Sequence, residues 1–433
     1  MVLKIFLFPF IAINVVKKSD SASWKIEHQC PQCGAPVTLE ETDHLLACGY
    51  CRVRLWLYTR GLFSYCFVPR SPPMEKIWFI PYWRFKGLAF SCNQEQVRHR
   101  FVDTTLCGVN FPQLPRSLGF RPQALSLKPA GSFAGSLIDG AFARPSVIPS
   151  AIRDRFLPKG HPRPSASQNR RESHQAFIGE ALSLVHTPVY EKNGKVWDAL
   201  LNRPLDHNSS FQVKELLFPE RTPSPLTFLP VLCPQCGWDL EGSSRSVAMV
   251  CRNCQSAWCL SQGNMKWIPF GVPSQWNGDQ ELLPFWQLKF QFAGIELNTL
   301  EDLHRLANTS ISRQNSTLLF WIPAFKLPPR LFLQAARRAT LSSFMEFRKE
   351  DLPPVTIHSA TLALEEAAQC VKILLASLAV PRRRFMERMD SFSAKLEEAT
   401  LSFVPFSPKA HEFVQPHLPL SVPRRALYWK RFI

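Results

Sequence analysis

The sequence lacks the short motifs that most often carry catalysis. Its 433 residues contain no Walker loop, no Gly-x-Gly-x-x-Gly fingerprint, no His-Glu-x-x-His pair and no Gly-x-Ser-x-Gly elbow. Glycine is scarce, at 18 residues, whereas proline is abundant, at 37, a combination that suits β-rich modules with stiff connections. These absences speak against the common nucleotide-binding, zinc-protease and serine-hydrolase classes. We therefore expect a protein that is not an enzyme.

Acidic residues are few relative to basic ones. The chain has 34 Asp and Glu against 51 Lys and Arg, which gives a formal net charge of +17. A positive balance of this size favours contact with nucleic acid, but the basic residues are spread along the chain and form no recognised nucleic-acid motif. The charge therefore leaves nucleic acid as an alternative partner beside an unknown protein partner, and it leaves the oligomeric state open.

Long apolar runs are absent beyond the first residues. Residues 2–16 are apolar apart from Lys4 and Asn14, which is too short for an ordinary membrane span. This stretch resembles a signal peptide, and the alternative is a leader outside the fold. We favour residues 1–23 as such a leader and expect a cytoplasmic protein with no transmembrane segment, although the leader leaves export open.

What the sequence does contain is two ordered groups of cysteines. Each group begins with Cys-Pro-Gln-Cys-Gly, and a second Cys-x-x-Cys follows after fourteen residues. The first group is Cys30, Cys33, Cys48 and Cys51, and the second is Cys233, Cys236, Cys251 and Cys254. Two such turns can enclose one ion with four thiolates, an arrangement that suits zinc and less often iron. Disulfides are the alternative, and they require an oxidising compartment. The pattern predicts two structural zinc ions whose closed shells do not activate water.

Each cysteine group resembles a zinc ribbon with a rubredoxin-like knuckle. The resemblance covers roughly 25 to 30 residues in each copy, and the tandem arrangement is similar to bacterial zinc-ribbon proteins. Rubredoxins separate their knuckles by a longer segment, so the resemblance favours zinc over iron. It implies a metal-stabilised module and supplies no activity. His28 and His44, beside the first group, are interpreted as groups that support the ligands or lie at the surface.

The repeat extends beyond the cysteines. At an offset of 203 residues, Pro81-Tyr82-Trp83 matches Pro284-Phe285-Trp286, and Lys86 matches Lys289. This equal spacing predicts that a ribbon and the aromatic strand after it form one duplicated unit. If so, Cys33→Ser destabilises the first unit and spares the second. We interpret Pro188-Val189-Tyr190 and Pro323-Ala324-Phe325 as weaker echoes of the same motif.

Aromatic and basic residues alternate in this repeated strand. Such a pattern fits stacking on single-stranded nucleic acid, and the alternative is ordinary sheet packing with the basic residues on the wet face. The candidate binding residues are Tyr82, Trp83, Arg84, Lys86, Phe285, Trp286 and Lys289. The five cysteines outside the two groups are interpreted as buried free thiols: Cys66, Cys92, Cys107, Cys259 and Cys370.

The expected fold class is α+β, with two four-cysteine zinc ribbons, each followed by a small antiparallel aromatic-rich β-sheet, and helices in the C-terminal third. The predicted segments are an apolar leader (1–23), zinc ribbon one (24–60), β-sheet module one (61–128), a basic, proline-rich and mostly unstructured insertion (129–175), a β-hairpin segment (176–225), zinc ribbon two (226–265), β-sheet module two (266–327), a helical segment (328–400) and C-terminal strands (401–433).

Two helices and a closing pair of strands are expected near the C-terminus. One helix runs from Arg330 to about Phe347, and the other from Ser359 to Ala379. The strands are 401–406 and 418–429. The candidates for the buried side of the first helix are Leu331, Leu333, Ala336, Ala339 and Leu341.

Together these patterns predict a non-catalytic zinc-binding scaffold or adaptor that contacts a protein partner through its duplicated units. The alternative is a nucleic-acid-binding zinc-ribbon protein that acts on single-stranded DNA or RNA.

Overall fold

A computed structural model describes most of the chain, with gaps. The described residues are 24–69, 74–110, 114–119, 125–133, 140–147, 174–205, 219–220, 223–274, 276–310, 316–342, 347–348, 351–415 and 417–427. The predicted leader (1–23), most of the predicted insertion (148–173) and the end of the predicted C-terminal segment (428–433) lie outside them.

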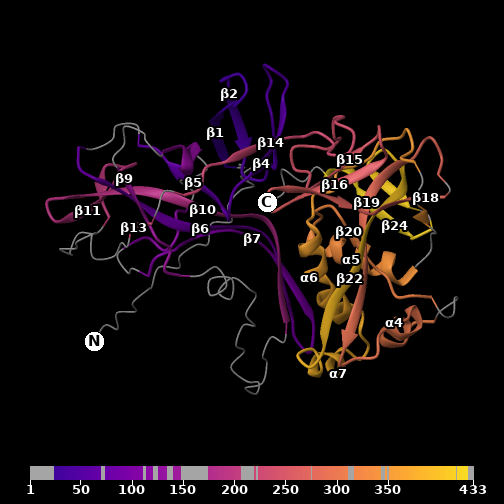
Figure 1. The fold of residues 1–433 in the computed structure, drawn as a ribbon. Coiled ribbons are helices and arrows are strands. Elements are labelled where there is room, and N and C mark those ends of the chain that lie inside the picture. Colours follow the sequence, from indigo (N-terminus) through magenta and orange to yellow (C-terminus); the bar gives the residue numbers. More distant parts are fainter. Residues whose placement is uncertain are drawn as a thin grey trace, which may run out of the picture.

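The described part of the chain is mixed α+β and consists mostly of strands. Figure 1 shows a first lobe on the left, a second lobe on the right and the ribbons above their junction. All five α-helices of the described residues lie in the C-terminal third, as predicted: α4 (Leu300–Ala307), α5 (Pro329–Ser342), α6 (Leu364–Leu378), α7 (Arg382–Glu387) and α8 (Arg424–Leu427).

The first lobe is built on two long strands. β6 (Ile77–Cys92) and β10 (His174–Lys192) pair antiparallel along their length, and every residue of β6 is buried. β7 (Val97–Cys107) forms a hairpin with β6. The remaining strands of this sheet are β1 (Lys25–Gln29), β2 (Pro36–Glu40), β5 (Phe63–Phe67), β8 (Leu127–Pro129), β9 (Gly140–Ala143), β11 (Lys195–Asp198), β12 (Arg203–Pro204) and β13 (Pro219–Glu220).

The second lobe repeats this plan. β19 (Glu281–Ala293) pairs antiparallel with β22 (Ser393–Pro408) on one side and with β20 (Phe320–Pro323) on the other. The sheet is completed by β18 (Phe270–Pro273), β21 (Phe347–Arg348), β23 (Glu412–Gln415) and β24 (Leu420–Pro423).

The two sheets differ from the small antiparallel sheets that were predicted. They contain eleven and seven strands, and each takes its central partner strand from far along the chain. Parallel pairs also occur, between β5 and β10 and between β18 and β22. The hairpin predicted around Asn193-Gly194 is present between β10 and β11, but β10 extends well beyond it and lies at the centre of the first sheet.

The register of the strands shows how closely the lobes correspond. Trp83 faces Leu184 on one neighbouring strand and Leu106 on the other. Trp286 faces Leu401 and Ile322 in the same way. Both long strand pairs also carry a β-bulge beside the matched lysines. In the first lobe it lies in β10 between residues 179 and 181, near Lys86, and in the second lobe it lies in β22, opposite residues 289 and 290. The repeat found in the sequence is therefore a repeat of whole sheets.

The weaker echoes of the Pro-aromatic motif were assigned wrongly. Pro188 lies on the partner strand and faces Phe79, and Pro405 faces Leu282 in the same position of the second lobe. Pro323 ends β20, a strand that corresponds to β7. The echoes are thus different parts of the repeated sheet rather than further copies of one strand.

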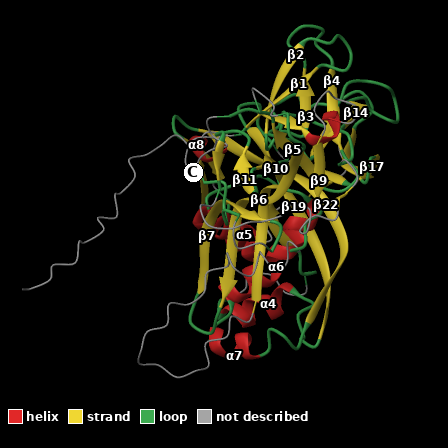
Figure 2. Ribbon diagram, turned by 90° about the vertical axis from the view of Figure 1, so that its left-hand side faces the viewer, coloured by secondary structure: helices red, strands yellow, loops and turns green. Residues whose placement is uncertain are grey.

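Helices α5 and α6 pack between the lobes. Figure 2 shows α5 and α6 between the strands of the first sheet and those of the second, and one core joins Leu88, Phe90 and Ile178 to the buried face of α6. α6 is shorter than predicted at its start, and α5 ends at Ser342. The buried residues of α5 are Phe332, Ala335, Ala336, Ala339 and Thr340, so the prediction was right for two alanines and wrong for the leucines, which are half-buried.

The chain after α7 also differs from the prediction. β22 begins at Ser393 and is far longer than the strand expected at 401–406. The expected strand at 418–429 is the short β24 followed by the helical turn α8. Part of the predicted insertion is also ordered, because β9 and the 3₁₀ turn Ala130–Phe133 pack against the first sheet.

Candidate metal centres

The two cysteine groups come together as predicted. In each group four Sγ atoms lie within 4.8 Å of one another, and these are the groups of the described residues that could hold a metal ion. The opposed Sγ atoms are separated by 3.7 Å (Cys30 to Cys51), 3.7 Å (Cys33 to Cys48), 3.4 Å (Cys233 to Cys254) and 3.5 Å (Cys236 to Cys251).

These distances fit a metal shell and not a disulfide. A disulfide bond holds its sulfur atoms about 2.05 Å apart, and all of these cysteines are free. A tetrahedral ion with Zn–S bonds of about 2.3 Å holds its sulfur atoms about 3.8 Å apart. The soft, all-sulfur donor set therefore suits a zinc-like ion in four-coordination, with no position left open for water.

The knuckles are shaped by backbone hydrogen bonds. The N–H of Gly34 donates to the carbonyl of Cys30 at 2.8 Å, and the N–H of Cys30 donates to Ala35. Gly34 has a φ of +73°, a conformation that a residue with a Cβ adopts only with strain. Gly237 has the same φ and donates to Cys233 in the same way. The chain turns back on itself at identical points in both groups, so the thiols face inward.

Local hydrogen bonds favour the thiolate form, which is the form that binds metal. The backbone N–H groups of Cys51 and Tyr50 point at the sulfur of Cys48 and lower the pKa of that thiol to about 6. In the second group, the side chain of Asn253 and the backbone of Trp238 lower the pKa of Cys236 to about 6. Each group therefore holds at least one thiol that is largely ionised at neutral pH.

The two cysteine groups do not belong to separate units. β4 (Arg54–Tyr58) pairs with β3 (Leu45–Ala47) of the first group and also with β14 (Thr227–Pro230), which leads into the second group. The second group continues into a three-stranded sheet of β15 (Ala248–Cys251), β16 (Ser256–Ser261) and β17 (Asn264–Ile268).

Side-chain contacts also connect the two cysteine groups. Leu45 and Trp56 pack in one core with Cys233 and Cys251. The Nη1 and Nη2 atoms of Arg54 donate to the carbonyls of residues 240 and 242 at 2.8 and 2.7 Å. Because of this shared core, we now expect Cys33→Ser to disturb the second ribbon as well as the first.

The two histidines near the first group are not among its ligands. His44 is half-buried, and desolvation, with the charges of Lys326 and Arg245, lowers its pKa to about 4. His28 packs against the ring of Phe228 with centroids 5.1 Å apart, and burial lowers its pKa.

The remaining five cysteines are free, as predicted. Cys66, Cys92 and Cys370 are buried, and Cys107 and Cys259 are half-buried. Burial raises the pKa of the Cys66 and Cys370 thiols, which keeps these two groups protonated and unreactive.

The candidate binding residues of the aromatic strands lie inside the protein, with one exception. Tyr82, Trp83, Phe285 and Trp286 are buried. The hydroxyl of Tyr82 donates to the carbonyl of Pro115 at 2.9 Å. Lys289 is half-exposed and pairs with Glu397 and Glu398. The Tyr82, Trp83 and Trp286 side chains therefore pack and bond within the sheets rather than presenting faces for stacking.

Arg84 and Lys86 form a buried charge network. The guanidinium of Arg84 donates twice to Glu41 at 2.9 Å, and once to Asp103 at 2.5 Å. It also lies over the ring of Trp24, 4.1 Å from its centroid. The Lys86 Nζ lies 3.6 Å from Glu41, whose side chain is 2% exposed. Sequence reasoning missed Glu41, because no spacing connects this turn residue with a strand forty residues later.

Comparison with models of protein families, with curated proteins and with solved structures gives no match for this chain. The architecture and the cysteine geometry therefore carry the functional argument alone. Among the described helices, none has both the length and the apolar character needed to span a bilayer.

Proposed function

We propose that the chain is a zinc-stabilised, non-catalytic scaffold that docks a protein partner through its ribbon face. The observation that carries this is the pair of closed four-cysteine shells at the junction of the two lobes. Zinc fits both shells by donor type and by sulfur separation, and a full shell leaves the ion no position for substrate. In so small a module, the ion supplies the stability that a hydrophobic core would otherwise provide.

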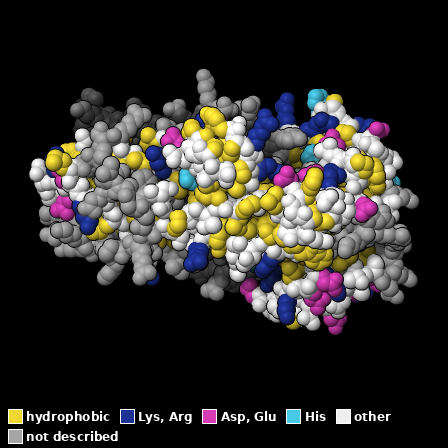
Figure 3. All heavy atoms as spheres, turned by 45° about the horizontal axis from the view of Figure 1, so that its top comes forward, with side chains coloured by type: hydrophobic (Ala, Val, Ile, Leu, Met, Phe, Trp, Pro, Cys, Tyr) yellow, Lys and Arg dark blue, Asp and Glu magenta, His cyan; other side chains and the backbone are white. Residues whose placement is uncertain are grey.

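An exposed apolar surface on the second ribbon supports a protein partner. Leu232, Trp238 and Trp267 are 45%, 62% and 51% exposed. Figure 3, in which the ribbon end of the molecule comes forward, shows apolar side chains beside lysines and arginines on this face. Exposed tryptophan is common at the centre of protein interfaces and uncommon on ordinary surface.

The first ribbon shows that the side chain of Trp238 is not required by the knuckle fold. At the offset of 203 residues Trp238 corresponds to Ala35, and the carbonyl of each accepts a hydrogen bond from the N–H of the first cysteine of its group. Both ribbons have the same knuckle geometry, so the indole of Trp238 serves something other than the metal shell. Nucleic acid is the weaker candidate, because Trp83, Arg84 and Lys86, on which that alternative rested, lie buried in the sheet.

The test is affinity capture from native lysate with nuclease added. The double variant Trp238→Ala/Trp267→Ser removes both exposed indoles, and Trp238→Ala introduces the residue that ribbon one carries at the same position, so we expect it to bind two zinc ions and to lose the captured protein. Tyr50→Ser, at a residue 70% exposed on ribbon one, is the matched control and should retain it. Capture that survives in the double variant, or that disappears with nuclease in the wild type, contradicts the proposal.

A further inference from the structure

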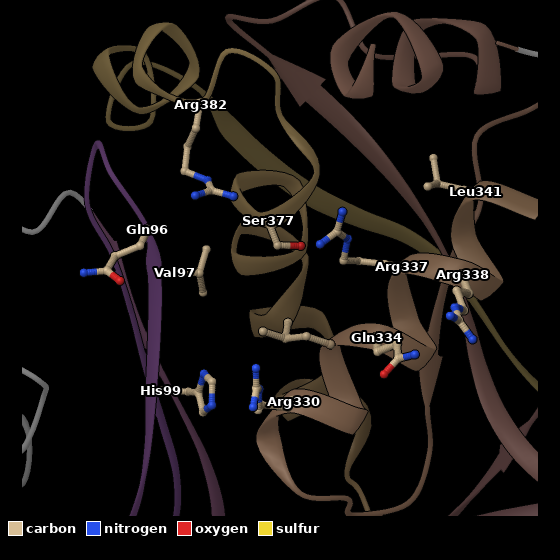
Figure 4. Close-up of a pocket in the computed structure, with 11 residues that line it drawn as sticks. Gln96, Val97, His99, Arg330, Gln334, Arg337, Arg338, Leu341, Ser377 and Arg382 are labelled. Atoms are coloured by element: carbon tan, nitrogen blue, oxygen red, sulfur yellow. The ribbon is translucent and has the colours of Figure 1, made fainter. Parts of the chain in front are cut away.

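A basic cavity lies where the two lobes meet, away from the cysteine groups. Its volume is about 440 Å³, within the range of small-molecule sites. Figure 4 shows the β6–β7 hairpin on one side and the helices on the other, with the arginine side chains between them. The cavity therefore exists only when both lobes are folded and docked.

One face of α5 supplies most of its wall. Arg330, Gln334, Arg337 and Leu341 follow one another at intervals of three or four residues, which places them along one side of the helix. Leu333 and Leu341, two of the half-buried leucines that the sequence assigned to the core, also line this cavity. The face is turned toward the hairpin of the first lobe, which contributes His99.

The positive charge in this cavity is not neutralised. Its lining includes Arg330, Arg337, Arg338 and Arg382, and no acidic side chain is among the described residues that line it. Figure 4 shows Arg330 beside His99, and Arg337 and Arg382 reaching toward Ser377. Mutual repulsion makes such a cluster costly unless an anion accompanies it. Partial desolvation and the charge of Arg382 lower the pKa of Arg337, whose side chain is still exposed to solvent.

Two of the arginines are held in place and two are free to bind. Arg382 donates through Nε to the carbonyl of Ala376 and through Nη1 to that of Glu95, each at 2.8 Å. Arg338 donates to the carbonyl of Pro419. Arg330 and Arg337 make no hydrogen bond or ion pair with any described residue. Their guanidinium forks are therefore unused donors at the edge of a cationic cavity.

We propose that this cavity binds a small phosphorylated ligand that carries at least two negative charges. The planar fork of arginine matches the oxygens of a phosphate group, and each such bond is charge-assisted. Arg330 and Arg337 bind the phosphate oxygens, Arg382 adds positive charge from the opposite side, and Gln334 offers an amide. A hairpin that closes one side of a cavity of this volume suits a compact ligand better than a polymer.

The experiment is isothermal titration of the zinc-loaded full-length chain with inorganic pyrophosphate at low ionic strength. We expect one binding site per chain. Arg337→Gln and Arg330→Gln should each weaken binding at least about tenfold, because each removes a charge-assisted contact. Arg337→Lys keeps the charge and loses the fork, so its affinity should fall between the wild type and Arg337→Gln. Zinc content is measured before and after each titration, because pyrophosphate also binds free zinc.

The control is Arg384→Gln, which removes an exposed arginine of α7 that does not line the cavity. It should bind within about twofold of the wild type, because net charge alone contributes little at this distance. Equal melting temperatures of all variants show that the fold is intact. Absence of binding, equal losses in Arg384→Gln and Arg337→Gln, or binding of a single-stranded oligonucleotide in place of pyrophosphate overturns the proposal.

Discussion

The indole N–H of Trp286 donates to the backbone carbonyl of Leu362 at 2.8 Å. In the first lobe, Trp83 makes the same bond to the carbonyl of Val147, at 2.7 Å. Each acceptor lies in a segment that packs against the same sheet but is many residues later in the sequence than the strand that holds the tryptophan. The hydrogen bond therefore fixes a long connection to the central strand in both lobes.

The surrounding backbone repeats this arrangement bond for bond. The N–H of Gly108 donates to the carbonyl of Pro81, and the N–H of Ala324 donates to that of Pro284. Val147 then donates to Gly108, as Leu362 does to Ala324. A duplicated hydrogen-bond network of this kind indicates that the two lobes share one folding plan.

Replacing either tryptophan by phenylalanine should destabilise the protein to a similar extent. The ring volume is largely kept, but a buried carbonyl loses its donor, which costs about 1–3 kcal/mol. Urea unfolding of Trp83→Phe and Trp286→Phe measures the loss. Tyr82→Phe, which removes a hydroxyl bond to Pro115 in the same sheet, is a matched comparison. A tryptophan variant as stable as the wild type would show that the indole bond is not needed.

Much of this plan could be read from the sequence, and the limits have physical causes. The equal offset of the cysteine groups and of Trp83 and Trp286 indicated the repeat, because no insertion separates them within a lobe. The pairing of β10 with β6 and of β22 with β19 was not recognised, because α4 and its loops lengthen the second lobe and change the offset. Sequence spacing also could not reveal that Arg84 is buried, since its partner Glu41 lies in a ribbon turn.

The metal content gives the most direct test of the cysteine groups. Elemental analysis of the purified chain should find two zinc ions, and Cys33→Ser or Cys236→Ser should each reduce the count to one, because a tetrahedral shell loses a ligand. Cobalt substituted for zinc should give the absorption of a tetrathiolate site. Cys107→Ser, outside both groups, is the control and should retain two ions.

Because the two ribbons share a core, we expect the loss of one metal ion to destabilise the other ribbon as well. Cys236→Ser should increase hydrogen exchange in β4 as well as in β15, because β4 pairs with β14. Arg54→Met, which removes two charged donors from carbonyls of the second ribbon, should cost about 1.5–3 kcal/mol for each bond lost. Exchange that rises only in the second ribbon would show that the ribbons fold separately.

The buried network of Arg84 predicts a large effect from a single change. Arg84→Met leaves Glu41 in the core without its bidentate partner, and removing one member of a buried ion pair costs about 3–5 kcal/mol. Arg84→Met combined with Glu41→Met should be less damaging than Arg84→Met alone, because the fully buried carboxylate of Glu41 is then no longer left without Arg84. Thermal or urea unfolding compares the three proteins. Simple additivity of the two changes would contradict this account.

His186 gives a prediction about pH, and the internal repeat supplies its control. Its ring lies in the core of the first lobe, and burial lowers its pKa to about 4. It faces Pro81, and the residue in the same position of the second lobe, facing Pro284, is Phe403. The second lobe thus carries phenylalanine at this position, so His186→Phe is a replacement of similar shape that cannot bind a proton, and it also removes the contacts of Nδ1 with Ser64 and with the carbonyl of Tyr65.

The sign of the effect follows from the two pKa values. The unfolded chain binds a proton at about pH 6.5, whereas folded His186 does so only near pH 4, so its stabilising contribution is complete above pH 6.5 and is lost as the pH falls toward 4. Between pH 7.5 and pH 5 the wild type should lose about 2 kcal/mol more unfolding free energy than His186→Phe. Metal release and the other buried histidines affect both proteins equally, so the difference isolates this ring. Equal losses would mean that His186 is protonated as easily in the folded protein as in the unfolded chain.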